Sequence, residues 1–171
     1  MKNLAFLLLL PLAHAHMPGD AALDTTVEDP LISWALDGEF HEGDEVFVIR
    51  LPLSGGLAIP FELLVPHERR YQDWRPAYAV VGPGLPAPTS EALARLPRPL
   101  PDGFGAYVDL NEHAERLIIF ESVLRQMYYS SGPVGLPLGA GETQVWIWSP
   151  DGATGPWVLG FGVEEGFGGD A

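Results

Sequence analysis

The chain has 171 residues, of which 47% are hydrophobic, and its formal net charge is −14 at pH 7. Such an excess of acid repels phosphate backbones and anionic lipid, which argues against a nucleic-acid or membrane-surface role. The lack of cysteine excludes disulfides and thiolate metal sites. The 20 glycines and 17 prolines disfavour long helices, because proline lacks the amide donor and glycine favours turns.

The amino-terminal segment has the layout of a secretory signal peptide. Lys2 is followed by the apolar run LAFLLLLPLA and by Ala13-His14-Ala15, which puts small residues at the third and first positions before a cut. The run is shorter than the ~20 residues that span a bilayer. We therefore expect cleavage after Ala15, loss of residues 1–15, His16 as the new amino terminus, and a periplasmic or extracellular protein without a membrane anchor.

Alternating apolar residues after an amino-terminal extension (16–30) predict one all-β domain over residues 31–162. Ser54-Gly55-Gly56 is typical of a hairpin turn between the first two of these strands. The expected strands cover residues 45–51, 57–65, 78–81, 106–109, 117–120, 126–129, 144–148 and 157–161. About eight strands is the number typical of a single antiparallel β-sandwich or jelly roll.

A proline-rich excursion, residues 83–105, interrupts this pattern. Only Ser90 to Leu96 within it favours a helix, of about two turns, capped by Thr89 or Ser90. Neither side of the excursion holds enough strands for a core of its own, so we expect a surface excursion and not a domain boundary. The glycine-rich tail, residues 163–171, is expected to be flexible.

Two segments together resemble bacterial pre-peptidase C-terminal domains. The first, residues 36–66, shows that family's strand, acidic turn, strand, glycine turn and strand, and the second, residues 139–162, resembles its closing hairpin. The residues that carry the pattern are Gly38, Phe40, Asp44, Glu45, Phe47, Ile49, Leu51, Gly55 and Gly56, then Gly155, Trp157 and Leu159. A group of uncharacterised free-standing secreted bacterial proteins, which share a VGPGLP stretch, is similar too. The resemblance implies a jelly-roll-like sandwich that usually serves secreted enzymes as a non-catalytic accessory.

A copper site is one hypothesis for the residues that follow the expected cut. An amino-terminal histidine offers its α-amine and one imidazole nitrogen, and a second imidazole completes a histidine brace, which suits Cu(II). His16 supplies the first pair, His41, His67 or His113 the third nitrogen, and Met17 a soft ligand for Cu(I). The alternative is that these are exposed loop histidines.

A calcium site is a second hypothesis, because calcium takes several oxygen ligands from a flexible loop. The acidic stretch DGEFHEGDE offers Asp37, Glu39, Glu42, Asp44 and Glu45. It lacks the order of acids found in an EF-hand. A solvated turn between two strands explains the same residues.

Two tryptophans, Trp146 and Trp148, share one face of an expected strand because side chains alternate along it. We assign Val145 and Ile147 to the core, since the resembling family has aliphatic residues there, which leaves both indoles on the outer face. Exposed neighbouring tryptophans form a flat platform for sugar rings or for a protein partner. The alternative is that the proline-rich excursion covers them.

No catalytic motif is present in the sequence. A carboxylate pair such as Glu121 with Asp109 is able to act in acid/base chemistry, and Glu121 is equally able to pair with Arg125 or to cap a turn amide. The sequence therefore predicts a secreted or periplasmic non-catalytic module without a resident cofactor, which binds a protein or glycan partner. A periplasmic copper-binding protein that uses His16 is the alternative.

Overall fold

A computed structural model describes residues 16–164 except 114 and 123, so the expected signal peptide and most of the expected tail lie outside the described residues. Its elements are β1 (Met17–Asp20), β2 (Asp24–Thr26), β3 (Trp34–Phe40), β4 (Val46–Leu53), β5 (Leu57–Pro66), the 3₁₀ turn η1 (Arg69–Tyr71), β6 (Ala77–Gly82), α1 (Ser90–Arg95), β7 (Gly105–Asp109), β8 (Leu117–Glu121), β9 (Gln126–Ser130), β10 (Val134–Leu138), β11 (Gly141–Trp148) and β12 (Gly155–Phe161). In this part of the chain, no helix has the length and hydrophobicity needed to cross a membrane.

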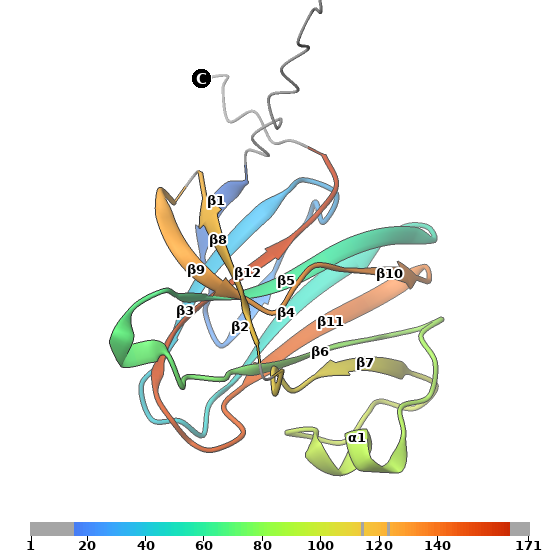
Figure 1. The fold of residues 1–171 in the computed structure, drawn as a ribbon. Coiled ribbons are helices and arrows are strands. Elements are labelled where there is room, and N and C mark those ends of the chain that lie inside the picture. Colours follow the sequence, from blue (N-terminus) through green and yellow to red (C-terminus); the bar gives the residue numbers. More distant parts are fainter. Residues whose placement is uncertain (1–15, 114, 123, 165–171) are drawn as a thin grey trace, which may run out of the picture.

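The strands form two facing sheets, as Figure 1 shows. The larger sheet has the order β1-β3-β12-β5-β9-β8, and β10 also pairs with β5. The smaller sheet has the order β2-β4-β11-β6-β7. The prediction of an all-β sandwich is confirmed.

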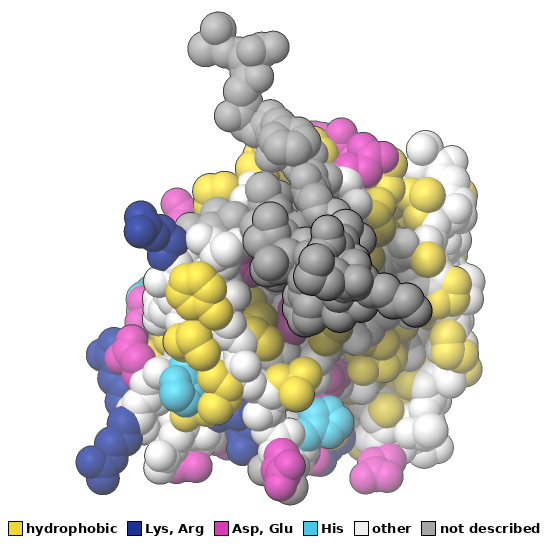
Figure 2. Space-filling model, turned by 45° about the horizontal axis from the view of Figure 1, so that its top comes forward, with side chains coloured by type: hydrophobic (Ala, Val, Ile, Leu, Met, Phe, Trp, Pro, Cys, Tyr) yellow, Lys and Arg dark blue, Asp and Glu magenta, His cyan; other side chains and the backbone are white. Residues whose placement is uncertain are grey.

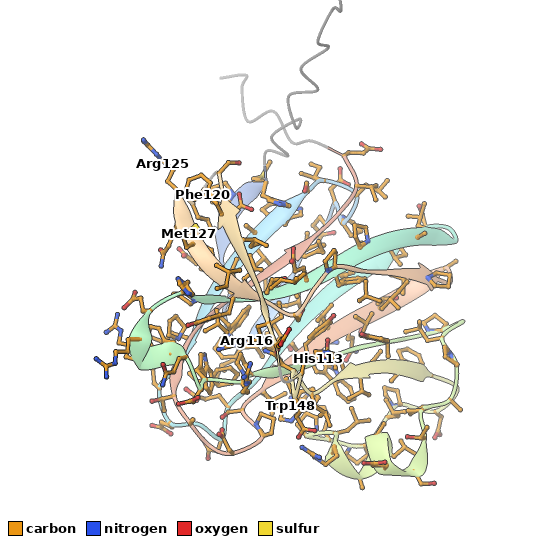
Figure 3. The ribbon with its side chains drawn as sticks, viewed as in Figure 1. His113, Arg116, Phe120, Arg125, Met127 and Trp148 are labelled. Carbon is orange, nitrogen blue, oxygen red and sulfur yellow. The ribbon has the colours of Figure 1, made fainter. Side chains whose placement is uncertain are left out.

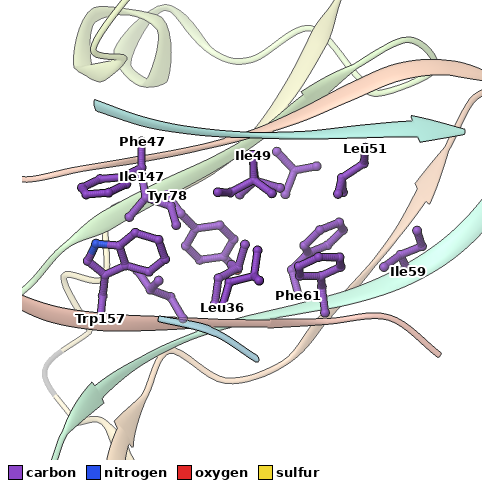
Figure 4. Packing of buried hydrophobic residues seen from close by; sticks show 14 of the residues in the cluster. Leu36, Phe47, Ile49, Leu51, Ile59, Phe61, Tyr78, Ile147 and Trp157 are labelled. Carbon is purple, nitrogen blue, oxygen red and sulfur yellow. The ribbon is translucent and has the colours of Figure 1, made fainter. Parts of the chain in front are cut away.

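The main core lies between the two sheets (Figure 4). Phe47, Ile49 and Leu51 of β4 point into it, as their alternation predicts. Trp157 of β12 faces them from the other sheet, with its ring centroid 5.0 Å from that of Phe47. Gly38 makes this packing possible, because a Cβ there would lie 2.1 Å from the Trp157 ring.

Two connections expected to be hairpins cross instead from one sheet to the other. Residues 54–56 join β4 of the smaller sheet to β5 of the larger one, and residues 149–154 join β11 to β12 in the same manner. Alternation shows that both strands have an apolar face. It does not show whether the two strands share a sheet, so the hairpin prediction is wrong at both places.

The amino-terminal extension belongs to the sandwich. Strand β1 pairs in parallel with β3, and β2 pairs in parallel with β4, so the sheets are mixed and not purely antiparallel. The Arg50 guanidinium bonds the Asp24 carboxylate at 2.8 Å and holds β2 in place. Val27, which follows, is buried in the main core.

The proline-rich excursion passes over the outer face of the smaller sheet. Its helix α1 is capped by Thr89, whose hydroxyl accepts a hydrogen bond from the backbone N–H of Ala92 at 3.1 Å. Of the two predicted cap residues, Thr89 and Ser90, the structure therefore has Thr89. Leu96, Leu100 and Phe104 of the excursion pack against the outward side chains of the smaller sheet and form a second apolar cluster with them.

Candidate functional site

Trp146 and Trp148 lie on the outer face of β11, while Val145 and Ile147 face the core as expected. The excursion nevertheless covers both indoles, which are 1% and 5% exposed. The indole N–H of Trp146 donates to the Gln144 side-chain oxygen at 2.8 Å. The exposed aromatic platform is therefore wrong, and the alternative is confirmed, because the proline-rich excursion packs on these rings.

His16 lies beside β3 and the end of β8. Its Nδ1 is 2.7 Å from the Ser33 hydroxyl, and its Nε2 is 3.7 Å from a Glu121 carboxylate oxygen. Nδ1 is thus held in a hydrogen bond within the protein.

The other three candidate histidines occupy different places in the fold. His41 lies in the turn after β3, His67 follows β5 with its ring 4.6 Å from that of Tyr129, and His113 follows β7. The His113 Nε2 is 3.7 Å from an Asp109 carboxylate oxygen. Within residues 16–164, apart from positions 114 and 123, no three or more His, Cys, Asp or Glu side chains are grouped so that they could hold a metal ion.

The acidic stretch predicted to bind calcium forms the end of β3 and the turn that follows. Asp37 and Glu39 lie in β3, Glu42 and Asp44 lie in the turn, and the Glu45 carboxylate accepts three backbone N–H groups of the same turn at 2.8–3.1 Å. Burial raises the pKa of Glu45, but these N–H groups together lower it below its usual range. The turn is thus stabilised by Glu45 itself, which agrees with the alternative explanation.

The predicted carboxylate pair is divided between the two sheets. Asp109 ends β7 of the smaller sheet and accepts from the Asn111 backbone N–H at 2.7 Å, whereas Glu121 ends β8 of the larger sheet. Strand pairing therefore does not bring them together.

A different surface stands out in the structure, the hairpin of β8 and β9. Four of the seven exposed large apolar side chains in the described part of the chain belong to it, namely Leu117, Ile118, Phe120 and Met127. Phe120 lies directly opposite Met127 across the two strands, and both project from the hairpin in Figure 3. On the face in Figure 2, apolar side chains gather on this side of the molecule, with basic side chains above and below them. We refer to these four side chains as the hairpin patch.

The other face of the hairpin continues the outer face of the larger sheet. Ile119 and Tyr128 contact a third apolar cluster that includes Leu64 of β5 and Val158 of β12. Burial raises the pKa of Tyr128 to about 12. Ile118, Phe120 and Met127 thus share the face that carries Tyr129, whereas Leu117 is exposed on the face of Ile119 and Tyr128.

Arg116 anchors the base of the hairpin. Its guanidinium donates to the Trp74 carbonyl at 2.9 Å and to the Gln72 carbonyl, and it lies 3.9 Å from the centroid of the Tyr129 ring. Burial, and then the charge of Arg75, lower the pKa of Arg116 to about 10. These contacts tie the start of β8 to the loop after η1.

Polar contacts hold the buried side of the hairpin to neighbouring strands. The Ser130 hydroxyl of β9 donates to the Glu62 carboxylate of β5. The Glu121 carboxylate of β8 forms an ion-pair contact with the His16 imidazole. Burial raises the pKa of Glu62, while the Ser130 hydrogen bond and then His16 oppose that rise.

The order Ser33, His16, Glu121 has the residue types of a hydrolase triad, but its geometry is that of a structural contact. Ser33 is 5% exposed, and the 3.7 Å contact to Glu121 exceeds the 2.6–3.2 Å reach expected of a working proton relay. The neighbouring cavity, lined by His16 and Glu62, measures about 60 Å³ and is too small for a typical substrate.

Comparison with known proteins gives one result. The chain is similar to a pre-peptidase C-terminal domain. The solved structure is that of this domain of the collagenase from Bacillus anthracis, with 10% sequence identity and a TM-score of 0.41, over 81% of this chain and 93% of that one. No model of a protein family matches the chain, and no curated protein matches it.

The hairpin patch is the site that sequence reasoning missed. Residues 117–120 were expected to form a strand, and β8 confirms this. An apolar strand in a sequence is assigned to the core by default, and only the sheet order shows that β8 lies at an edge. The available signal was the pair of arginines, Arg116 and Arg125, that flank the apolar run.

Proposed function

We propose that the protein is an extracytoplasmic, non-catalytic β-sandwich module that binds a protein partner through the hairpin patch. The observation that carries the proposal is the concentration of exposed apolar side chains on this one hairpin. Contiguous exposed apolar surface marks interaction sites, and aromatic residues and methionine are enriched at interfaces. The signal-peptide pattern that ends at Ala15 supports the location.

The arrangement of polar side chains supports a binding role over catalysis. Glu45 holds a turn, Arg116 holds a loop, and Glu62 holds β9 through Ser130. A protein partner is favoured over a glycan because the two indoles that would have stacked on sugar rings are buried beneath the excursion.

Site-specific photo-cross-linking tests the proposal. Benzoyl-phenylalanine at position 120 is compared with the same residue at position 93, since Leu93 is an exposed apolar residue on α1, outside the hairpin. We expect a cross-linked protein adduct from position 120 in the secreting cell and none from position 93, and the double change Ile118→Ser and Met127→Ser should reduce that adduct at least about tenfold.

Equal cross-linking from positions 93 and 120, or none from either, would contradict the proposal. The mass of the secreted protein tests its location in the same preparation. A chain that begins at His16 supports export and cleavage, whereas a chain that retains Met1 in the cytoplasm argues against both.

A further inference from the structure

A hollow of about 450 Å³ lies on the outer face of the larger sheet. Five strands contribute to it, because residues that alternate with core residues point outward from β1, β3, β12, β5 and β9. Its volume is within the range of about 300–1,000 Å³ that ligand pockets have. We call it the acidic hollow, and its lining includes Asp20, Asp37, Glu39, Pro66, Tyr128 and Val158.

Two carboxylates of the acidic hollow lie side by side on neighbouring strands. Asp20 of β1 is opposite Asp37 of β3 in their parallel register. Burial, and then the charge of Asp20, raise the pKa of Asp37. Glu39 lies two residues further along β3, so it shares the outward face with Asp37. Like charges so placed repel each other, and a cation bound between them removes that repulsion.

The basic side chains of the protein do not supply that cation. None is among the described residues that line the hollow. Arg70 interacts with Glu39, but its main partner is Glu68, whose carboxylate accepts from the Arg70 guanidinium at 2.8 Å. Arg125 projects away from the sandwich in Figure 3. The net charge of −14 favours a cation from solution.

The Tyr128 hydroxyl is a second, independent sign of a ligand. Tyr128 is only 4% exposed, and its ring packs with Leu64 and Val158. Burial first, and then the charge of Asp37, raise its pKa, so the hydroxyl lies on the side of the carboxylates. Within the described residues this hydroxyl makes no hydrogen bond. Buried polar groups are normally paired, so its place in a hollow favours a ligand that bonds it.

The lining suits an organic cation better than a metal ion. Among the residues that the structure describes, no three acids are grouped closely enough to hold a metal. Ala21, Pro66 and Val158 add apolar atoms to the lining, which a bare ion does not use. A primary ammonium has three N–H donors, and its alkyl stem packs on apolar surface.

We propose that the acidic hollow binds an alkylammonium group, which donates to the Asp20 and Asp37 carboxylates and to the Tyr128 hydroxyl oxygen. A lysine side chain of another protein and a free diamine both present this group. The site is separate from the hairpin patch, because Tyr128 and Phe120 lie on opposite faces of the hairpin. The inference therefore does not depend on the proposed function.

Titrations of the mature chain followed by nuclear magnetic resonance test the inference. The first probe is Nα-acetyl-lysine N-methylamide, whose only charge is the ammonium. The matching norleucine derivative has the same stem without that charge. Cadaverine represents a free diamine, and calcium chloride represents a metal ion.

We expect the lysine probe to shift the backbone amide signals of residues 20, 37 and 128, and the norleucine probe to shift none of them. Added salt should weaken the lysine probe several-fold, because ions screen the exposed part of the attraction. Tighter binding of the lysine probe than of cadaverine identifies a protein side chain as the source of the ammonium, and the reverse order identifies a free diamine.

Three variants keep the shape of the hollow while they remove one group each. Asp37→Asn should weaken the lysine probe about tenfold, and Tyr128→Phe, which removes only the hydroxyl, about fivefold. Asp20→Asn, at an exposed position where folding is not at risk, should weaken it about threefold. Asp102→Asn, an exposed acid of the excursion, is the matched control and should change nothing.

Equal shifts from the lysine and norleucine probes would overturn the inference, since the charge would then not matter. Equal affinities of Asp37→Asn, Tyr128→Phe and Asp102→Asn would overturn it too. If calcium moves the same signals at lower concentration than the lysine probe does, the hollow is a metal site and the inference fails. Phe120→Ser should leave the lysine probe unaffected, and a loss of binding there would contradict the separation of the two sites.

Discussion

Apolar side chains outside the main core have opposite exposures on the two sheets. On the smaller sheet, Trp146 and Trp148 point outward and are buried, because the proline-rich excursion packs on them. On the larger sheet, Phe120 and Met127 lie on the face that carries Tyr129, which packs against the main core, but they lie at the edge of the sheet and remain exposed, Phe120 by 62%. The comparison teaches that an apolar residue outside the main core is a candidate for binding only where no other segment of the chain covers it.

Removal of a covered indole should produce the largest change. Trp146→Ala leaves a cavity beneath the excursion, and we expect it to lower the free energy of unfolding by ~3–5 kcal/mol. Urea unfolding followed by far-UV circular dichroism measures this loss. Leu93→Ala, at an exposed position of α1, is the control, and equal losses from the two variants would contradict the burial of Trp146.

A smaller change should follow from loss of the helix cap in the covering segment. Thr89→Ala removes the side-chain acceptor for the Ala92 N–H and should cost about 1 kcal/mol. We expect this loss of helix stability to appear as faster amide hydrogen exchange in α1. Ser90→Ala is the matched control, since Thr89 and not Ser90 is the cap residue; an equal effect of both changes would argue against this cap.

The pH dependence of stability probes the support beneath the exposed hairpin. Burial raises the pKa of Glu62 above the reference value of 4.5, so the folded state holds this proton more tightly than the unfolded chain does. Stability from this group is therefore present below about pH 4.5 and is lost as pH rises through the folded-state pKa.

Glu62→Gln should therefore raise the melting temperature at pH 7 and have little or no stabilising effect at pH 4, with a change in the free energy of unfolding of about 1 kcal/mol or less. Gln retains an oxygen that accepts from the Ser130 hydroxyl. Thermal melts at both pH values measure the difference, and Glu28→Gln, at an exposed position, is the control. A lower melting temperature at pH 7 would show that the charged carboxylate stabilises the fold.

The smallest effect on stability should come from the exposed side of the comparison. Phe120→Ser removes a side chain that is mostly in water, so we expect a change within about 0.5 kcal/mol. The same urea unfolding experiment measures it. A loss as large as that from Trp146→Ala would mean that the hairpin patch is part of the folded core and not a free surface.

Much of the fold was predictable because it depends on local patterns. Alternation placed Ile49 in the core, and the family resemblance assigned Val145 to the core and Trp146 to the outside. The proline-rich excursion contains one short helix after Thr89, as expected. Each of these features is determined by residues close together in the sequence.

The rest depends on contacts between distant residues. Strands β1 and β2 have four and three residues, with Pro18, Gly19 and Asp24 among them, so neither shows a strand pattern before β3 and β4 pair with it. Whether an outward residue is covered is also a long-range property. This is why the sequence located Trp146 correctly within its strand but left two alternatives for its exposure.

Both ends of the described chain meet at the start of β3. The Met17 N–H donates to the Ser33 carbonyl at 2.6 Å, and the Ser33 N–H donates to the Glu164 carbonyl at 2.7 Å. The first and last described residues of the sandwich thus lie close together. Neighbouring chain ends permit circular permutation of a domain and its insertion into a loop of a host protein. A short linker between His16 and Glu164, with new ends opened elsewhere on the surface, should therefore preserve the fold and let the module be grafted into another protein.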